Sequence, residues 1–107
     1  MKGRLSALEA KSLIDQQNAS VLDIRDAGSF ANGHITNAIH MSGDTFTEFM
    51  DTTEKNCHII VCCHHGVMSI SASEVLLNKG FEHVYSLDGG FASWYRKYPD
   101  ACVGLLI

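Results

Sequence analysis

The stretch HIIVCCHHGVMSISAS, residues 58–73, runs from apolar, β-branched residues into paired cysteines, paired histidines, a glycine and several serines. Its first part, residues 58–62, predicts a strand that is buried on both faces. A capping-box pattern, Ser71 to Glu74, predicts a helix that ends at Gly80. The stretch therefore predicts a strand, a loop that begins at Cys63 and a helix, in that order.

The rest of the chain alternates short apolar segments with segments of helical pattern. Further strands are predicted at residues 21–24, 38–41 and 84–87. Helices are predicted at about 7–17 after a capping box of Ser6 and Glu9, beyond a cap at Asp44, and at 91–98 before Pro99. Short apolar strands that alternate with helices are typical of a covered parallel sheet. The predicted fold is α/β, with a central parallel sheet of about five strands and helices on both faces.

Length and composition restrict the class of protein. The 107 residues suit one domain, residues 1–107, and 46% apolar with 19% charged residues is a globular composition. A formal net charge of −4 argues against a nucleic-acid partner. No apolar run reaches the ~20 residues that span a bilayer, and the N-terminus has no signal-peptide pattern. We expect a cytoplasmic protein without membrane contact, whose four cysteines are free thiols.

The paired cysteines raise two alternatives, a metal site and a redox pair. Residues 62–65 are consecutive and cannot all face one ion, and the other cysteines and histidines form no recognisable second ligand pair. A redox pair normally separates its cysteines by two residues. We therefore expect no metal, and we interpret Cys62, Cys57 and Cys102 as structural thiols.

Cys63 is the cysteine with a predicted chemical role. In a parallel α/β sheet, ligands bind where loops leave the carboxyl ends of the strands. The free amides of a following helix favour negative charge, which lowers the pKa of a thiol and produces the reactive thiolate. Gly66 lets the loop curl, and the small Ser69 lets amides turn inward. The loop could then cradle an anion at or near the sulfur.

Several motifs carry a resemblance to a known family. They are Val21 to Arg25 with Ser29-Phe30, Gly33-His34-Ile35 and Asn37 to His40; Cys63 to Ser69; and Leu87 to Trp94. These motifs occur in order and span most of the chain. Together they resemble the signatures of the rhodanese (sulfurtransferase) family, and the length resembles its single-domain thiosulfate sulfurtransferases.

The resemblance implies covalent catalysis by Cys63. The thiolate would take the outer sulfur of a small donor such as thiosulfate, and the persulfide would pass it to a thiophilic acceptor such as cyanide. A protein thiol is an alternative acceptor. The implied substrate-binding residues are those of the loop: His64, His65, Gly66, Val67, Met68 and Ser69. The resemblance implies no cofactor, because loop amides would stabilise the charge.

The sequence departs from the family pattern in its charges. The loop has no Lys or Arg, Ile70 follows it where many relatives have a basic or polar residue, and Val67 and Met68 make its rim apolar. We therefore expect weak binding of thiosulfate, and a persulfide, a thiosulfonate or a carrier protein as the better donor.

Three rival functions stay open. A related phosphatase would need an Arg at position 69, where this chain has Ser69. A non-catalytic binding module would usually lack the cysteine. A sulfur-relay subunit would use the same chemistry at Cys63.

Other motif residues are interpreted as structural. Asp23 and Arg25 are expected to form a partly buried ion pair. His34 is expected to pack and to form a hydrogen bond. Gly89 and Gly90 are expected to serve backbone geometry. Three aromatic residues at helical spacing are expected in the core: Trp94, Tyr95 and Tyr98.

Overall fold

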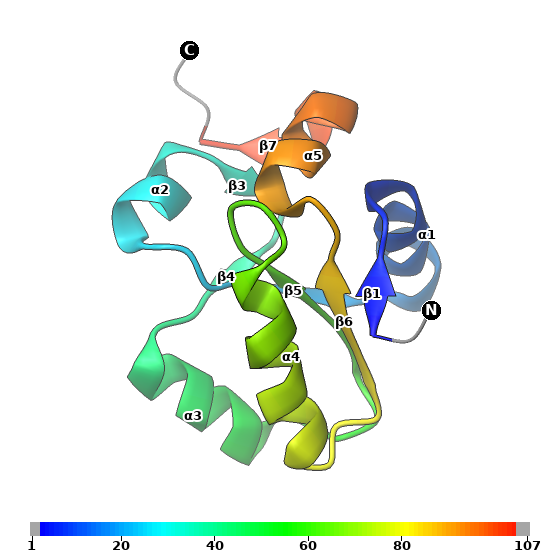
Figure 1. Cartoon of the computed structure of the whole chain (residues 1–107), viewed down its shortest axis with the longest axis vertical. Coiled ribbons are helices and arrows are strands. Elements are labelled where there is room, and N and C mark those ends of the chain that lie inside the picture. The colour runs from blue at the N-terminus through cyan, green and yellow to red at the C-terminus, as the bar shows by residue number, and fades with distance from the viewer. Residues whose placement is uncertain (1–2, 105–107) are drawn as a thin grey trace.

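Five parallel strands form the central sheet of the computed structural model, which describes residues 3–104. Their order across the sheet is β1 (Arg4–Leu5), β6 (His83–Leu87), β5 (His58–Cys62), β2 (Ser20–Asp23) and β4 (Ile39–His40) (Figure 1). A small antiparallel pair, β3 (His34–Ile35) and β7 (Cys102–Val103), lies apart from this sheet. The predicted fold class, a single α/β domain with a parallel sheet of about five strands, is confirmed.

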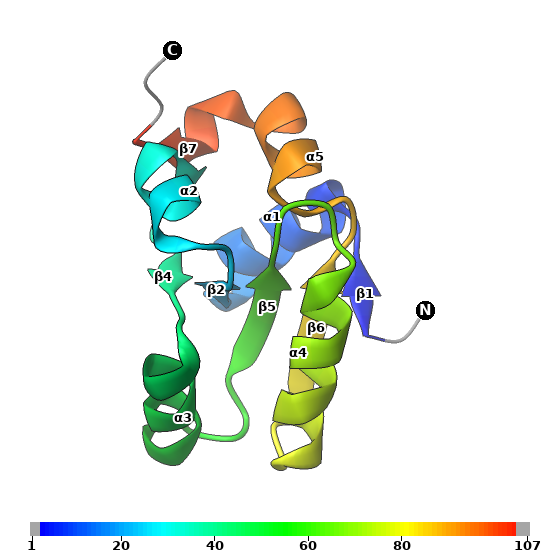
Figure 2. The same cartoon turned by 60° about the vertical axis from the view of Figure 1, so that its left-hand side comes forward.

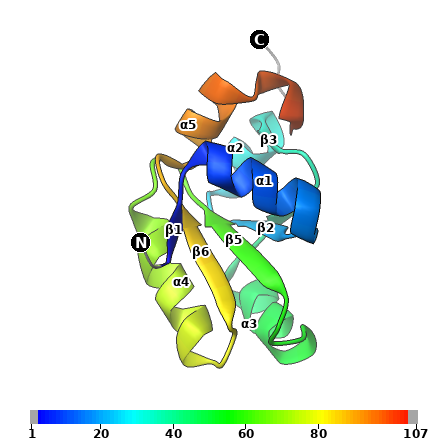
Figure 3. The ribbon, with the colours of Figure 1, turned by 90° about the vertical axis from the view of Figure 1, so that its right-hand side faces the viewer.

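Helices cover both faces of the sheet. The first face carries α1 (Ala7–Gln17) and α5 (Gly90–Lys97), and the second carries α3 (Gly43–Thr52) and α4 (Met68–Asn78). Figure 3 shows α1 on the near side of the strands, with α3 and α4 behind them. Two shorter elements, α2 (Ala27–Asn32) and η1 (Pro99–Ala101), complete the chain. Within residues 3–104, no helix is long and apolar enough to cross a membrane.

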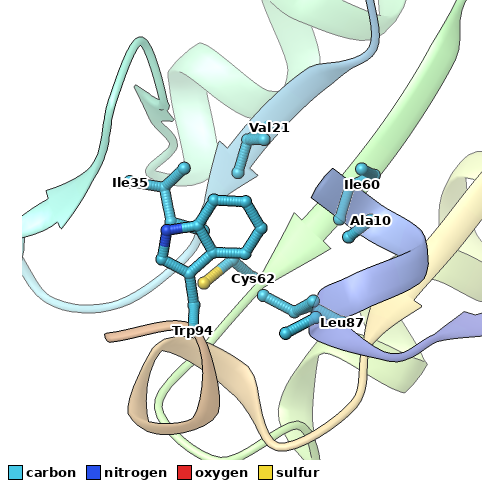
Figure 4. Packing of buried hydrophobic residues seen from close by; sticks show 8 residues of the cluster. Ala10, Val21, Ile35, Ile60, Cys62, Leu87 and Trp94 are labelled. Carbon is cyan, nitrogen blue, oxygen red and sulfur yellow. The ribbon is translucent and has the colours of Figure 1, made fainter. Parts of the chain in front are cut away.

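Strand β5 supplies buried residues to both faces, as its two-sided apolar sequence predicts. Ile60 and Cys62 belong to the core under α1 and α5, whereas Ile59 and Val61 belong to the core under α3 and α4. The first core contains both the indole of Trp94 and the Cys62 side chain (Figure 4). Side chains of successive strand residues point to opposite faces, so Cys62 is directed into this core.

The starts of two helices differ from their predicted positions. The cap of α3 is Ser42, not Asp44, and the Ser42 amide donates to Thr45 Oγ1 at 2.7 Å. Helix α4 begins at Met68 rather than after Ser71, which lies inside the helix. The capping box of α1, between Ser6 and Glu9, is confirmed with both of its hydrogen bonds.

The interpretation of the C-terminal aromatic residues was correct for one of them and wrong for another. Trp94 is 1% exposed, while Tyr95 is an exposed residue of α5, and Tyr98 is partly buried against the first core. On a helix that covers the edge of a small domain, only one stripe faces inward, and Tyr95 lies outside that stripe.

The carboxyl ends of β2 and β5 bring two distant segments together. The strands pair in parallel with Asp23 opposite Cys62, and the Ile24 amide donates to the Cys62 carbonyl at 2.9 Å. The segment that leaves β2 therefore lies beside the loop that leaves β5. We call residues 63–69 the Cys63 loop, and its last two residues are the first two of α4.

Candidate functional site

The Cys63 sulfur accepts hydrogen bonds from the loop that follows it. The backbone N–H of Gly66 lies 3.2 Å from Sγ, and that of Ser69 lies 3.3 Å from it. The Ser69 hydroxyl is 3.3 Å from the same sulfur and 2.6 Å from the hydroxyl of Ser86 on β6. The loop thus surrounds Sγ. In the first turn of α4, the Ser69 amide donates to this sulfur. This explains why α4 needs no serine cap at position 71.

The two neighbouring thiols have opposite electrostatic environments. Burial alone raises the pKa of Cys63, but hydrogen bonds from the Ser69 hydroxyl and from loop amides outweigh it and leave the pKa below that of an ordinary thiol. For Cys62, burial and the nearby Asp23 carboxylate both raise the pKa. Relative to an ordinary thiol, the environment therefore favours the thiolate form at Cys63 and the protonated form at Cys62.

We expect Cys63 to be alkylated with a pH midpoint below the ~8.5 of an unperturbed thiol. The rate of iodoacetamide modification, followed per cysteine by peptide mass spectrometry, measures that midpoint. Cys102 is the internal comparison, because burial raises its pKa. A Cys63 midpoint at or above that of a free thiol would contradict stabilisation of the thiolate by the loop.

The N-terminus of α5 lies against the Cys63 loop and donates hydrogen bonds to its carbonyls (Figure 2). The amides of Phe91 and Ala92 donate to the carbonyls of Cys63 and His64 at 2.8 and 3.2 Å. Gly66 has φ +87°, and a Cβ there would lie 2.7 Å from the Gly89 amide nitrogen. Because these loop carbonyls face α5, the loop amides are free to face the sulfur.

A buried ion pair stabilises the segment that lies beside the loop. Asp23 and Arg25 side chains are 0% and 4% exposed, and Arg25 Nε and Nη2 donate to both Asp23 carboxylate oxygens at 2.8 to 3.1 Å. Arg25 Nη2 also donates to the Gly33 carbonyl at 2.6 Å, and the guanidinium lies over the Phe91 ring. The predicted pair is present and is fully buried. It joins the end of β2 to the start of α5.

A pocket of about 390 Å³ opens beside Cys63. Its lining comes from residues 24–26 and from the loop residues Cys63, His64, His65, Val67 and Met68. Cys63 itself is only 5% exposed. The site therefore combines a buried, amide-bonded thiol with an opening large enough for a small molecule, which is the arrangement that a thiol nucleophile requires.

Comparisons with known proteins agree with this geometry. A sequence model of the Rhodanese-like domain family matches residues 6–97. The chain belongs to this family. It is also 41% identical over 87 residues to the thiosulfate sulfurtransferase GlpE of Vibrio cholerae, which covers 81% of this chain and 82% of the relative. The prediction of a rhodanese-type enzyme is therefore confirmed.

Solved rhodanese-like structures show the same fold. The solution structure of the rhodanese-like domain of the Anabaena Alr3790 protein matches with a TM-score of 0.79 and 30% identity, over 91% of this chain and 76% of that one. A rhodanese-related protein of Thermoplasma volcanium matches with a TM-score of 0.73 and 27% identity, over 89% and 92%.

The residues predicted for the rhodanese site divide into two groups in space. His64, His65, Val67 and Met68 line the pocket next to Cys63, whereas Gly66 and Ser69 contact the sulfur from behind and are absent from the pocket lining. Ile70 follows the loop but does not line the pocket either.

Sequence reasoning missed the residues that other elements bring to the site. Asp26 lines the pocket, and its Oδ1 lies 3.6 Å from His64 Nε2. Ser86 supports Ser69 from β6. The position of Asp26, three residues beyond a buried Asp at a strand end, could have drawn attention to it. Ser86 gives no such signal, because a serine in an apolar strand has many structural roles.

The remaining cysteines and histidines are absent from the lining of the Cys63 pocket. All four cysteines are free thiols. Among residues 3–104, no three His, Cys, Asp or Glu side chains are grouped so that they could hold a metal ion. His34 stacks on Phe30 with ring centroids 3.7 Å apart and bonds the Phe30 carbonyl through Nδ1, as the predicted packing role requires.

Proposed function

We propose that this protein is a sulfurtransferase that carries sulfane sulfur as a persulfide on Cys63. The observation that supports this most directly is the Cys63 sulfur, bonded by the Gly66 and Ser69 amides and placed at a small-molecule pocket. Membership of the rhodanese-like family and similarity to a thiosulfate sulfurtransferase support the same reaction class. Four free thiols fit a reducing compartment such as the cytoplasm.

The first half-reaction transfers one sulfur atom from the donor. The Cys63 thiolate attacks the outer sulfur of thiosulfate, a new S–S bond forms, and the donor S–S bond breaks. The bonding electrons leave with sulfite, and the negative charge of the enzyme then lies on the outer sulfur of the persulfide. Loop amides that already face Sγ can stabilise this charge without a metal.

The second half-reaction returns the enzyme to its thiolate. A nucleophilic acceptor, cyanide in an assay, attacks the outer persulfide sulfur, and Cys63 leaves as a thiolate. Because all four line the pocket, His64 and His65 would face both substrates, and Val67 and Met68 would contact any apolar part of a substrate. Because the first product must leave before the acceptor binds, the mechanism predicts ping-pong kinetics.

A sulfur relay to a protein thiol is the second candidate. The side chains of Val67 and Met68 are each 72% exposed next to Cys63, so the rim of the pocket presents an apolar surface to a macromolecular acceptor. The relay shares the first half-reaction and differs only in the acceptor. A phosphatase is disfavoured, because Ser69 occupies the loop position where an Arg would grip phosphate.

The intact mass of the protein tests the proposed function. After exposure to thiosulfate we expect a gain of one sulfur atom, which is lost when cyanide is added with formation of thiocyanate. The Cys63→Ser variant should gain no sulfur. A wild-type protein that stays unmodified with both thiosulfate and other sulfane donors would contradict the proposal.

A further inference from the structure

The charges at the Cys63 pocket do not suit a donor with two negative charges. The permanent cation in the lining is Arg25, but its side chain is 4% exposed and its charge is paired with Asp23. Asp26 is 68% exposed at the same pocket. Hydrogen bonds from the Ser29 hydroxyl and amide lower the pKa of Asp26 to about 2, so it stays a carboxylate.

The histidines compensate for this negative charge only when they are protonated. His64 is half-exposed, with Nε2 3.6 Å from Asp26 Oδ1, and His65 is exposed. A positive charge on His64 would therefore be paired with the Asp26 carboxylate and would not be available to bind an anionic substrate. The lining residues include no lysine, and the one arginine among them, Arg25, is already paired with Asp23.

Apolar side chains form much of the remaining pocket wall. Val67 and Met68 come from the loop, and Ile24 comes from the end of β2. Val67 and Met68 are each 72% exposed, so an apolar group of a substrate that covers them would remove apolar surface from water. Thiosulfate has no apolar part, so it gains no favourable contact with this surface.

On the basis of the proposed function, we infer that the Cys63 pocket selects an organic thiosulfonate over thiosulfate, with Val67 and Met68 as specificity-determining residues. A thiosulfonate has one negative charge where thiosulfate has two, and it carries an organic group for the apolar wall. The Cys63 thiolate attacks its outer sulfur, the S–S bond of the donor breaks, and a sulfinate leaves with the bonding electrons. The enzyme keeps the same persulfide, so the acceptor step is unchanged.

The test compares benzenethiosulfonate with thiosulfate under one thiocyanate assay with saturating cyanide. We expect kcat/KM to be at least about tenfold higher for benzenethiosulfonate. The double variant Val67→Ser with Met68→Ser should lose about fivefold or more with benzenethiosulfonate and less than about twofold with thiosulfate, because only the organic donor uses the apolar wall.

Two further variants separate apolar contact from charge and from general effects. Leu77→Ser removes another apolar side chain of α4, which lies in the last turn of the helix and is 42% exposed. This variant should leave kcat/KM unchanged with both donors. Asp26→Asn keeps an oxygen for the Ser29 amide but removes the charge. It should raise kcat/KM about threefold for thiosulfate at low salt and less for the singly charged donor.

The outcomes distinguish this inference from the proposed function. Turnover of both donors with equal efficiency, or with thiosulfate preferred, would overturn the inference and leave sulfur transfer standing. A donor preference that survives the double serine variant would overturn the role of Val67 and Met68. Absence of turnover and of persulfide with both donors, in a protein with a folded circular dichroism spectrum, would overturn the proposed function and the inference together.

Discussion

Replacement of Cys63 by serine is expected to reduce thiocyanate formation at least about a thousandfold. A serine hydroxyl at this position stays protonated at neutral pH, and it cannot form a persulfide. The substitution changes one atom, and the Gly66 and Ser69 amides can donate to the new oxygen as they do to Sγ. The free energy of unfolding should therefore change by less than about 1 kcal/mol.

Cys62→Ser is the matched control, because it makes the same change one residue earlier. Cys62 is 0% exposed and packs in the core that contains Trp94 (Figure 4). Its thiol has one acceptor within reach, the Cys63 carbonyl at 3.5 Å. We expect a loss of about 1–3 kcal/mol in the free energy of unfolding, because a hydroxyl is costlier to bury than a thiol. Activity per folded molecule should stay near that of the wild type.

When both variants are measured in parallel, Cys63→Ser should lose activity but keep its stability, whereas Cys62→Ser should lose stability but keep its activity. Urea titration reports stability, and thiocyanate formation per folded molecule reports activity. Turnover in Cys63→Ser, or a stably folded but inactive Cys62→Ser, would show that the wrong cysteine or the wrong mechanism has been assigned.

The contrast between the two cysteines was predictable because it depends on local geometry. An apolar strand that ends at Cys62 directs that side chain to one face, and the next residue begins a loop at the carboxyl edge of the sheet. The four strands with apolar runs were predictable for the same reason. The two-residue strands β1, β3 and β7 were not, since two residues show no periodicity. Strand β4 is equally short, but it lies within a longer apolar segment, residues 38–41.

The start of α4 and the full set of pocket residues depend on tertiary structure. Ser71 has the pattern of a cap, but the sulfur of Cys63 binds the Ser69 amide and lets the helix begin earlier, at Met68. Asp26 reaches the pocket because β2 lies next to β5 in the sheet. Strand order is not encoded in any single segment, so sequence reasoning identified the loop residues and missed this neighbour.

Gly90→Ala is expected to reduce sulfur transfer by about a hundredfold or more without touching the sulfur. Gly90 has φ +60°, and a Cβ there would lie 2.5 Å from the Cys63 carbonyl oxygen and 2.6 Å from the His64 carbonyl carbon. These are backbone atoms, so the Cys63 loop and α5 must move apart. The bonds from the Phe91 and Ala92 amides would then lengthen. A displacement of ~1 Å in a catalytic group can cost a factor of ~100 in rate.

Gly80→Ala separates this steric effect from backbone strain. Gly80 also has a positive φ, +99°, but a Cβ there would meet nothing within 4 Å, and the residue lies beyond the far end of α4. It should lose about 1–2 kcal/mol of stability, as an alanine in the left-handed region does, and keep its activity. Gly90→Ala should lose more stability, about 3 kcal/mol or more, and its Cys63 should be alkylated with a higher pH midpoint, because the loop amides no longer surround the thiolate. If folded Gly90→Ala matched Gly80→Ala in both turnover and alkylation midpoint, the contact with α5 would not be what arranges the loop around Cys63.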